Sequence, residues 1–193
     1  VAGFDAWGIE ETVKWTIGMF AFAVWDRRDR SLTLARDRIG EKPLYYGMQN
    51  GTFLFASELK AIRAHPDFMP EINRDALVSY LRFSYVPAPH SIYKGIKKLL
   101  PGHFICIHSP VSDETPRIYW SLEHEYRKGM SEPFCGSEDE ATDELETKLK
   151  ATVKSRMISD VPLGAFLSGG IDSSTVVALM QSQSDRPVNT FTV

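Results

Sequence analysis

The chain has 193 residues, of which 43% are hydrophobic and 24% charged, and its formal net charge is −3 at neutral pH. This composition supplies enough apolar material for a packed core and excludes a mainly disordered chain. The slight acidic excess disfavours a nucleic-acid-binding protein, because contact with a phosphate backbone needs a basic surface.

Membrane and export signals are missing from the sequence. No apolar run approaches the ~20 residues that a membrane helix needs, and the N-terminus lacks the basic-then-apolar pattern of a signal peptide. Cys106 and Cys135 have no CxxC spacing and no histidine partner nearby, so we expect free thiols. We therefore expect a cytoplasmic protein. Because the chain begins at Val1 without an initiator Met and ends inside an apolar run, we also expect it to be a segment of a longer protein.

The first part of the chain predicts an α+β unit with an antiparallel sheet. Residues 4–16 have the spacing of an amphipathic helix that is interrupted at Gly8. The apolar run 19–25 predicts a strand buried on both faces, with its aromatic residues, Trp25 among them, in the core. Further strands are expected at 31–35, 44–47, 52–56 and 102–108, and helices at 57–64 and from Asn73 or Asp75 to Phe83.

Local signals refine these elements. Asn50-Gly51 is a strong hairpin signal between two of the strands. Ser57 is a plausible N-cap for the helix that follows it. The charged segment 36–38 (Arg-Asp-Arg) suggests an anion site at first sight, but we expect a salt-bridged turn that packs the sheets.

The chain changes character at residue 109. Proline and glycine punctuate 109–136, which we expect to be a surface linker anchored by Tyr119 and Trp120. Beyond it, Ser137 and Glu140 have the form of a capping box at the start of a long helix. Strands at 162–167 and 188–193 and a helix at 173–182 then follow, the start of a parallel α/β sheet.

The segment Ser168–Ser174 (Ser-Gly-Gly-Ile-Asp-Ser-Ser) joins a predicted strand to a predicted helix. Unpaired N–H groups and the helix dipole favour an anion at such a junction. Adjacent glycines let phosphate oxygens approach the backbone, and serine hydroxyls add donors. The segment lacks the lysine of GxxxxGK[ST] and is not GxGxxG. A plain glycine turn with Ser and Asp helix caps is the structural alternative, but the clustered polar groups between strand and helix favour phosphate binding.

Two sets of residues resemble known families. Ser168–Ser174 resembles the SGGxDS signature of the pyrophosphatase-loop ATP family, whose members cleave ATP between the α- and β-phosphates to activate an acceptor as an adenylate. The rest resembles the glutaminase domain of glutamine-hydrolysing asparagine synthetases. It does so at residues 18–26, 35–46, 55–60, 85–89 and 100–103.

The resemblance implies two partial domains. Residues 1–108 would be part of an α+β N-terminal-nucleophile amidohydrolase sandwich. Residues 137–193 would begin an α/β parallel-sheet pyrophosphatase-loop ATP domain, and 109–136 would link the two. The family's nucleophile is a cysteine at the mature N-terminus. Val1 is not that residue, so we assign no catalytic residue to this chain.

The resemblance also implies a site for ATP and Mg2+. Asp172 would contact the metal, and Leu167 and Val193 match family positions that touch adenosine. The implied ATP-binding residues are Leu167, Ser168, Gly169, Gly170, Asp172, Ser173, Ser174 and Val193.

The implied function is that of a segment of an asparagine synthetase, which converts aspartate, glutamine and ATP to asparagine, glutamate, AMP and pyrophosphate. The partners would be small molecules, neither nucleic acid nor membrane, and a homodimer is compatible with the intact protein. Amidotransferases that act on sugar carboxylates or form β-lactams remain alternatives, as does a catalytically inactive nucleotide-binding fragment. A sulfurtransferase or NAD synthetase is disfavoured by the matches in the first half.

Overall fold

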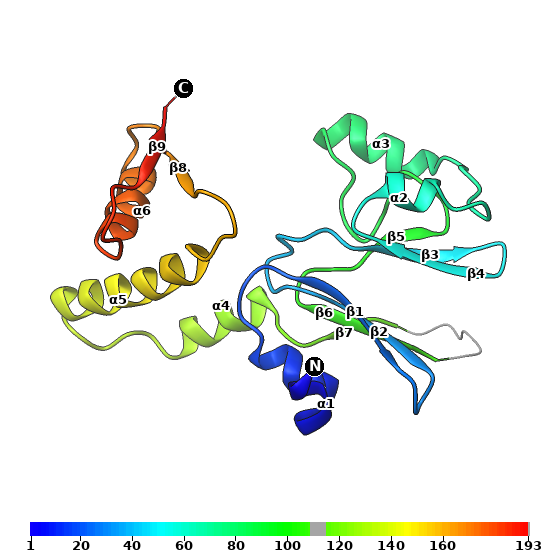
Figure 1. Ribbon diagram of the computed structural model, residues 1–193, viewed down its shortest axis with the longest axis horizontal. Coiled ribbons are helices and arrows are strands. Elements are labelled where there is room, and N and C mark those ends of the chain that lie inside the picture. The colour runs from blue at the N-terminus through cyan, green and yellow to red at the C-terminus, as the bar shows by residue number, and fades with distance from the viewer. Residues whose placement is uncertain (109–114, 193) are drawn as a thin grey trace. The chain divides into compact units, whose positions relative to one another are not determined.

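The computed structural model describes residues 1–108 and 115–192 (Figure 1). Residues 109–114 of the predicted linker, and Val193, lie outside the described residues. The chain divides into two compact units, Val1–Tyr126 and Arg127–Val193. Within the described part, no helix has the length and apolar character needed to cross a membrane.

The first unit contains two antiparallel sheets. One has the strand order β1-β2-β6-β7 and the other has the order β4-β3-β5. Its helices are α1 (Ala2–Trp15), α2 (Leu59–Arg63) and α3 (Arg74–Phe83). Its strands are β1 (Ala21–Asp26), β2 (Ser31–Arg36), β3 (Tyr45–Gln49), β4 (Thr52–Ala56), β5 (Ile96–Lys98), β6 (His103–His108) and β7 (Arg117–Ile118).

Three apolar clusters hold these elements together as four layers. The largest lies between the two sheets and joins Leu34 of β2 to Tyr46 of β3. A second packs Ile62 of α2 against the β4-β3-β5 sheet. The third packs Val13 of α1 against Phe104 on the other sheet. In Figure 1, α2 and α3 accordingly lie outside one sheet and α1 outside the other, so the layers run helix, sheet, sheet, helix.

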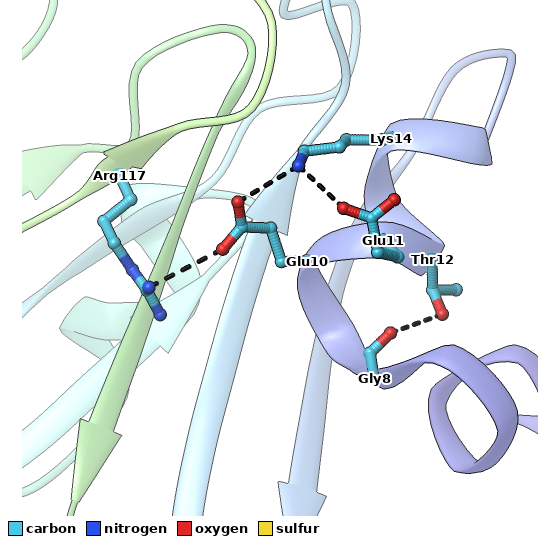
Figure 2. A network of polar contacts seen from close by, with 6 residues as sticks. All are labelled: Gly8, Glu10, Glu11, Thr12, Lys14 and Arg117. Carbon is cyan, nitrogen blue, oxygen red and sulfur yellow. Dashed lines mark hydrogen bonds and ion pairs between the residues drawn. The ribbon is translucent and has the colours of Figure 1, made fainter.

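Helix α1 has the predicted break at Gly8, whose φ of 76° is left-handed. Beyond the break, Thr12 donates a hydrogen bond to the Gly8 carbonyl at 2.6 Å (Figure 2). Glu10 forms ion pairs with Lys14 at 3.1 Å and with Arg117 of β7 at 3.7 Å. These exposed pairs contribute little stability, so α1 is attached to the sheet mainly by apolar contacts, which include the buried Val13.

Several local predictions are confirmed. Asn50 and Gly51, both with positive φ, turn β3 into β4 as the hairpin signal indicated. Asn73 is the N-cap of α3 and accepts two backbone N–H groups. Ser57 is not the cap of α2, which begins after Glu58 and has no side-chain cap.

Strand β1 is not buried on both faces, and the assignment of Trp25 to the core is wrong. Trp25 is 52% exposed. β1 lies at the edge of its sheet, where alternate side chains face outward, so a continuous apolar run does not by itself distinguish an edge strand from a central one.

The Arg-Asp-Arg segment at the end of β2 packs the sheets as expected, but by hydrogen bonds to backbone and not by salt bridges. The carboxylate of Asp37, 1% exposed, accepts N–H groups from Phe20, Glu41 and Lys42 at 3.3, 2.9 and 2.9 Å. The Arg36 guanidinium donates to three carbonyls. These are Gly40, Lys42 and Leu99, each at 2.7 Å. Both charges therefore satisfy backbone groups of the neighbouring connections.

The last strand of the first unit is fixed by Tyr119, as the predicted anchor role requires. Its hydroxyl donates to the Arg36 carbonyl at 2.8 Å, and its N–H donates to the Gly102 carbonyl at 2.9 Å. Burial, and then the nearby Asp37 carboxylate, raise the pKa of Tyr119 to about 12.

The second unit starts inside α4 (Leu122–Ser131) and continues through α5 (Glu138–Arg156), β8 (Gly164–Phe166), α6 (Ile171–Gln181) and β9 (Asn189–Phe191). The predicted capping box of α5 is present, since Ser137 and Glu140 each accept the other's N–H. β8 and β9 pair in parallel, with Ala165 opposite Thr190. This confirms the strand–helix–strand order expected from the sequence.

We predict that Asp37→Asn lowers the free energy of unfolding by about 3 kcal/mol, because an amide NH2 would face a buried N–H donor. Urea-induced unfolding measures this loss. Asp29→Asn is the matched control, since Asp29 lies exposed in the turn after β1. Equal stability of the two variants would contradict the role assigned to Asp37.

A second prediction concerns alkaline pH. Because the folded state raises the pKa of Tyr119, its contribution to stability is complete below pH ~10, the unfolded value, and is lost as pH rises toward 12. Tyr119→Phe should therefore lose less stability over this range than the unsubstituted protein. Unfolding curves at pH 9 to 12 test this, and the difference between the two proteins removes the contribution of Tyr46, whose pKa burial also raises.

Candidate nucleotide-binding loop

The predicted phosphate-binding segment lies between β8 and α6 in the second unit. The N–H of Leu167 donates to the Phe191 carbonyl at 2.8 Å, which extends the pairing of β8 with β9 to the edge of the loop. Helix α6 starts at Ile171, two residues before the predicted start at Ser173. Asp172 and Ser173 therefore belong to the first turn of the helix, where N–H groups point out of the helix end.

Only one glycine of the pair adopts a left-handed backbone. Gly169 has φ +77°, whereas Gly170 has φ −78° and ψ 159°, a conformation open to any residue. Only Gly169 therefore uses a backbone conformation that favours glycine. A Cβ at Gly169 would meet no atom within 4 Å, and one at Gly170 would lie 3.5 Å from Ser168 Oγ. The space beside both glycines is open, as a phosphate requires.

The start of α6 has no side-chain cap. Its N-cap is Gly170, and the first backbone hydrogen bond within the helix runs from Ser174 N to the Gly170 carbonyl at 3.1 Å. In α3 and α5, by contrast, Asn73 and Ser137 accept first-turn N–H groups. The alternative in which Ser and Asp serve as helix caps therefore does not describe this loop. Its first-turn N–H groups are available to an anion.

The three serines differ in their surroundings. Ser173 is half-buried and its hydroxyl lies inside the loop, 3.0 Å from Ser168 Oγ and 3.2 Å from the Gly170 carbonyl. Ser174 is exposed, and its hydroxyl has no hydrogen-bond partner within the described part of the chain. The sequence motif predicted that the serines add hydroxyl donors, and in the structure the hydroxyls of Ser173 and Ser174 have different surroundings.

The carboxylate of Asp172 is exposed in the first turn of α6. Among residues 1–108 and 115–192, no group of three or more His, Cys, Asp or Glu side chains gathers as a metal site. Mg2+ in nucleotide sites uses one or two carboxylates together with phosphate oxygens and waters. A single carboxylate beside an open phosphate position fits that donor set.

The remaining predicted residues lie at the ends of this region. Leu167 is half-buried directly before the loop, and Val193 falls outside the described residues.

The expectation that Cys106 has no histidine neighbour is wrong, since its Sγ lies 3.9 Å from His108 Nε2. The two alternate along β6, and a period-2 scan of the strand would have found them.

Comparisons with known proteins agree with both units. The sequence profile of the glutamine amidotransferase domain matches residues 1–120, and that of asparagine synthase matches residues 144–193. The chain belongs to the glutamine amidotransferases, in the family of the glutamine-hydrolysing asparagine synthetases.

Individual relatives match almost end to end along this chain. Glutamine-hydrolysing asparagine synthetase 3 of Bacillus subtilis is 35% identical over 95% of the chain and 29% of its own length. A putative asparagine synthetase 2 of Methanocaldococcus jannaschii is 37% identical over 99% of the chain and 35% of its own length. Amidase chyE of Penicillium rubens is 36% identical over 84% of the chain and 23% of its own length. The chain thus spans about a third or less of the length of these relatives.

Proposed function

We propose that this chain is a segment of an ATP-dependent, glutamine-hydrolysing asparagine synthetase and contributes its pyrophosphate-binding loop. The observation that carries the proposal is the uncapped N-terminus of α6, which follows a glycine turn at the carboxyl end of the parallel strand β8. The same chain matches a glutamine amidotransferase domain over its first 120 residues.

The proposed reaction starts with attack of an aspartate side chain on the α-phosphate of ATP and releases pyrophosphate. The N–H groups at the start of α6 would hold the phosphates and stabilise the charge that grows on the leaving group. Bound Mg2+, contacted by Asp172, would neutralise part of that charge. Ammonia from glutamine would then resolve the acyl-adenylate. Leu167 and Val193 are proposed to touch the adenosine portion.

The two-domain organisation remains part of the proposal. The four layers of the first unit support an N-terminal-nucleophile amidohydrolase sandwich over 1–108, and the parallel pair β8–β9 supports the start of a pyrophosphatase-loop domain over 137–193. Residues 109–136 would connect them, with Tyr119 attached to the first sheet. Cytoplasmic location and homodimer formation stay predictions.

The acceptor of the amide nitrogen is the open part of the proposal. A relative of similar identity carries the name amidase instead of asparagine synthetase. A related amidotransferase with another carboxylate acceptor is therefore the second candidate. Assays of adenylate formation with aspartate and with other carboxylates, performed on the intact enzyme, separate the two.

We predict that Asp172→Ala in the intact enzyme reduces Mg2+-dependent exchange of pyrophosphate into ATP at least a hundredfold, because the metal loses its carboxylate contact. Glutamine hydrolysis should stay within twofold, since it would occur in the other domain. Exchange that persists unchanged would remove Asp172 from the site. Nucleotide binding without exchange in the unsubstituted enzyme would instead favour an inactive nucleotide-binding protein.

A further prediction uses the open space beside Gly170. Gly170→Val is compatible with the local φ of −78° and leaves the fold intact, but its side chain occupies the position proposed for a phosphate. We expect ATP affinity to fall at least tenfold with little change in melting temperature. Gly129→Val in α4, a glycine with no atom within 4 Å of its Cβ position, is the control. Equal ATP affinity in both variants would contradict phosphate binding beside Gly170.

A further inference from the structure

The serines of the loop carry an inference that rests on the proposed function and assigns different roles to two neighbouring hydroxyls. Ser173 Oγ accepts a hydrogen bond from Ser168 N at 3.3 Å and lies 3.0 Å from Ser168 Oγ. It also donates to the Gly170 carbonyl at 3.2 Å. One hydroxyl thus joins the first residue of the loop to the helix that follows it.

These contacts use the hydrogen-bonding capacity of the Ser173 hydroxyl. A serine hydroxyl has one proton to donate and two lone pairs to accept. With its proton directed to the Gly170 carbonyl and its lone pairs facing Ser168, it has no proton left for a phosphate oxygen. The exposed hydroxyl of Ser174, one residue along, has no such commitment within the described residues.

The loop needs a closing contact of this kind. Gly169 has no side chain and adopts a left-handed backbone, so it contributes no packing to hold its own conformation. Neither glycine Cβ position has an atom closer than 3.5 Å, so packing against neighbours does not hold the turn either. The bridge from Ser173 to Ser168 spans both glycines and restricts the backbone between them.

We propose that Ser173 is a positioning residue for ATP phosphates: its hydroxyl closes the loop across Gly169 and Gly170, and so holds the N–H groups of the loop and of the first turn of α6 in the geometry that receives pyrophosphate. Ser174, in contrast, directs its hydroxyl outward to the ligand. The two serines would therefore affect nucleotide binding by different routes.

Hydrogen exchange of the nucleotide-free intact enzyme tests this assignment. Ser173→Ala should speed amide exchange at Ser168, whose N–H donates to the Ser173 hydroxyl, about tenfold, the factor expected when a hydrogen bond of ordinary strength is lost. Ser174→Ala should leave exchange there unchanged. A direct phosphate contact alone could not alter exchange without nucleotide, so unchanged exchange in Ser173→Ala would overturn the proposal.

The second measurement is ATP binding and ATP–pyrophosphate exchange in the same variants. Ser173→Ala should raise the KM for ATP about tenfold, and Ser173→Thr, which keeps the hydroxyl, should restore both KM and slow amide exchange. Failure of threonine to restore either quantity would count against the hydroxyl bridge. If Ser173→Ala does not fold, Ser173→Cys, a weaker hydrogen-bonding group of similar size, replaces it in both measurements.

Failure of the proposed function and failure of the positioning role of Ser173 give different results. If Asp172→Ala and Gly170→Val also leave ATP binding unchanged, the loop does not bind nucleotide and the proposed function fails. If those two variants lose ATP while Ser173→Ala behaves as the unsubstituted enzyme in both measurements, only the positioning role fails.

Discussion

The carboxylate of Asp37 is the interaction on which the first unit depends, because it connects elements that would otherwise leave buried N–H groups without acceptors. It binds the residue before β1 and two residues of the turn after β2. The carbonyl of the same residue accepts the N–H of Gly102 at 2.9 Å, just before β6. Strands that are distant in the sequence are thus fixed at one buried point.

Arg36 and Tyr119 form further hydrogen bonds around this buried carboxylate. The guanidinium of Arg36 reaches three carbonyls on two connections, and burial lowers its pKa. Tyr119 binds the Arg36 carbonyl from the segment that follows β6. An ion pair between the charged residues of this segment would have satisfied each charge locally and left the backbone groups unpaired. In the observed arrangement the two charged side chains instead form hydrogen bonds with backbone N–H and C=O groups. This satisfies both the charges and the backbone groups, whereas an ion pair would satisfy the charges alone.

Most of the element order could be predicted from the sequence, because it follows from local signals. Asn50-Gly51, Asn73 and Ser137 each act within a few residues, and the structure confirms all three. Ser57, which is also a local signal, is not the cap of α2, whereas the assignment of Trp25 failed because it depends on information that is not local. Whether the apolar run around Trp25 is central or at an edge depends on strand order, which the run itself does not contain.

At the candidate site, too, some features could be predicted from the sequence and others could not. The glycine pair and the helix that follows were predictable from the motif, as was the polar character of the loop. The direction of each serine was not, because Ser173 and Ser174 are the same residue type and differ only in the face of the helix on which they fall. The start of α6 at Ile171 rather than Ser173 decides that difference. A shift of two residues at a helix end, a common uncertainty, was enough to change the expected role of a side chain.

The glycine turn together with the uncapped helix start explains why function would be located at this end of α6, since α1 and α2 also lack a side-chain cap but do not follow such a turn. Asn73 and Ser137 satisfy the first N–H groups of their helices with their own side chains, and so exclude an anion from those ends. Gly170 leaves the corresponding groups of α6 without a side-chain acceptor. A glycine N-cap makes a helix start less stable than a Ser or Asn cap by roughly a few tenths of a kcal/mol, a cost that ligand binding can offset when phosphate supplies the missing acceptors. Ser173 limits that cost, since its bridge to Ser168 keeps the uncapped end ordered while no ligand is bound.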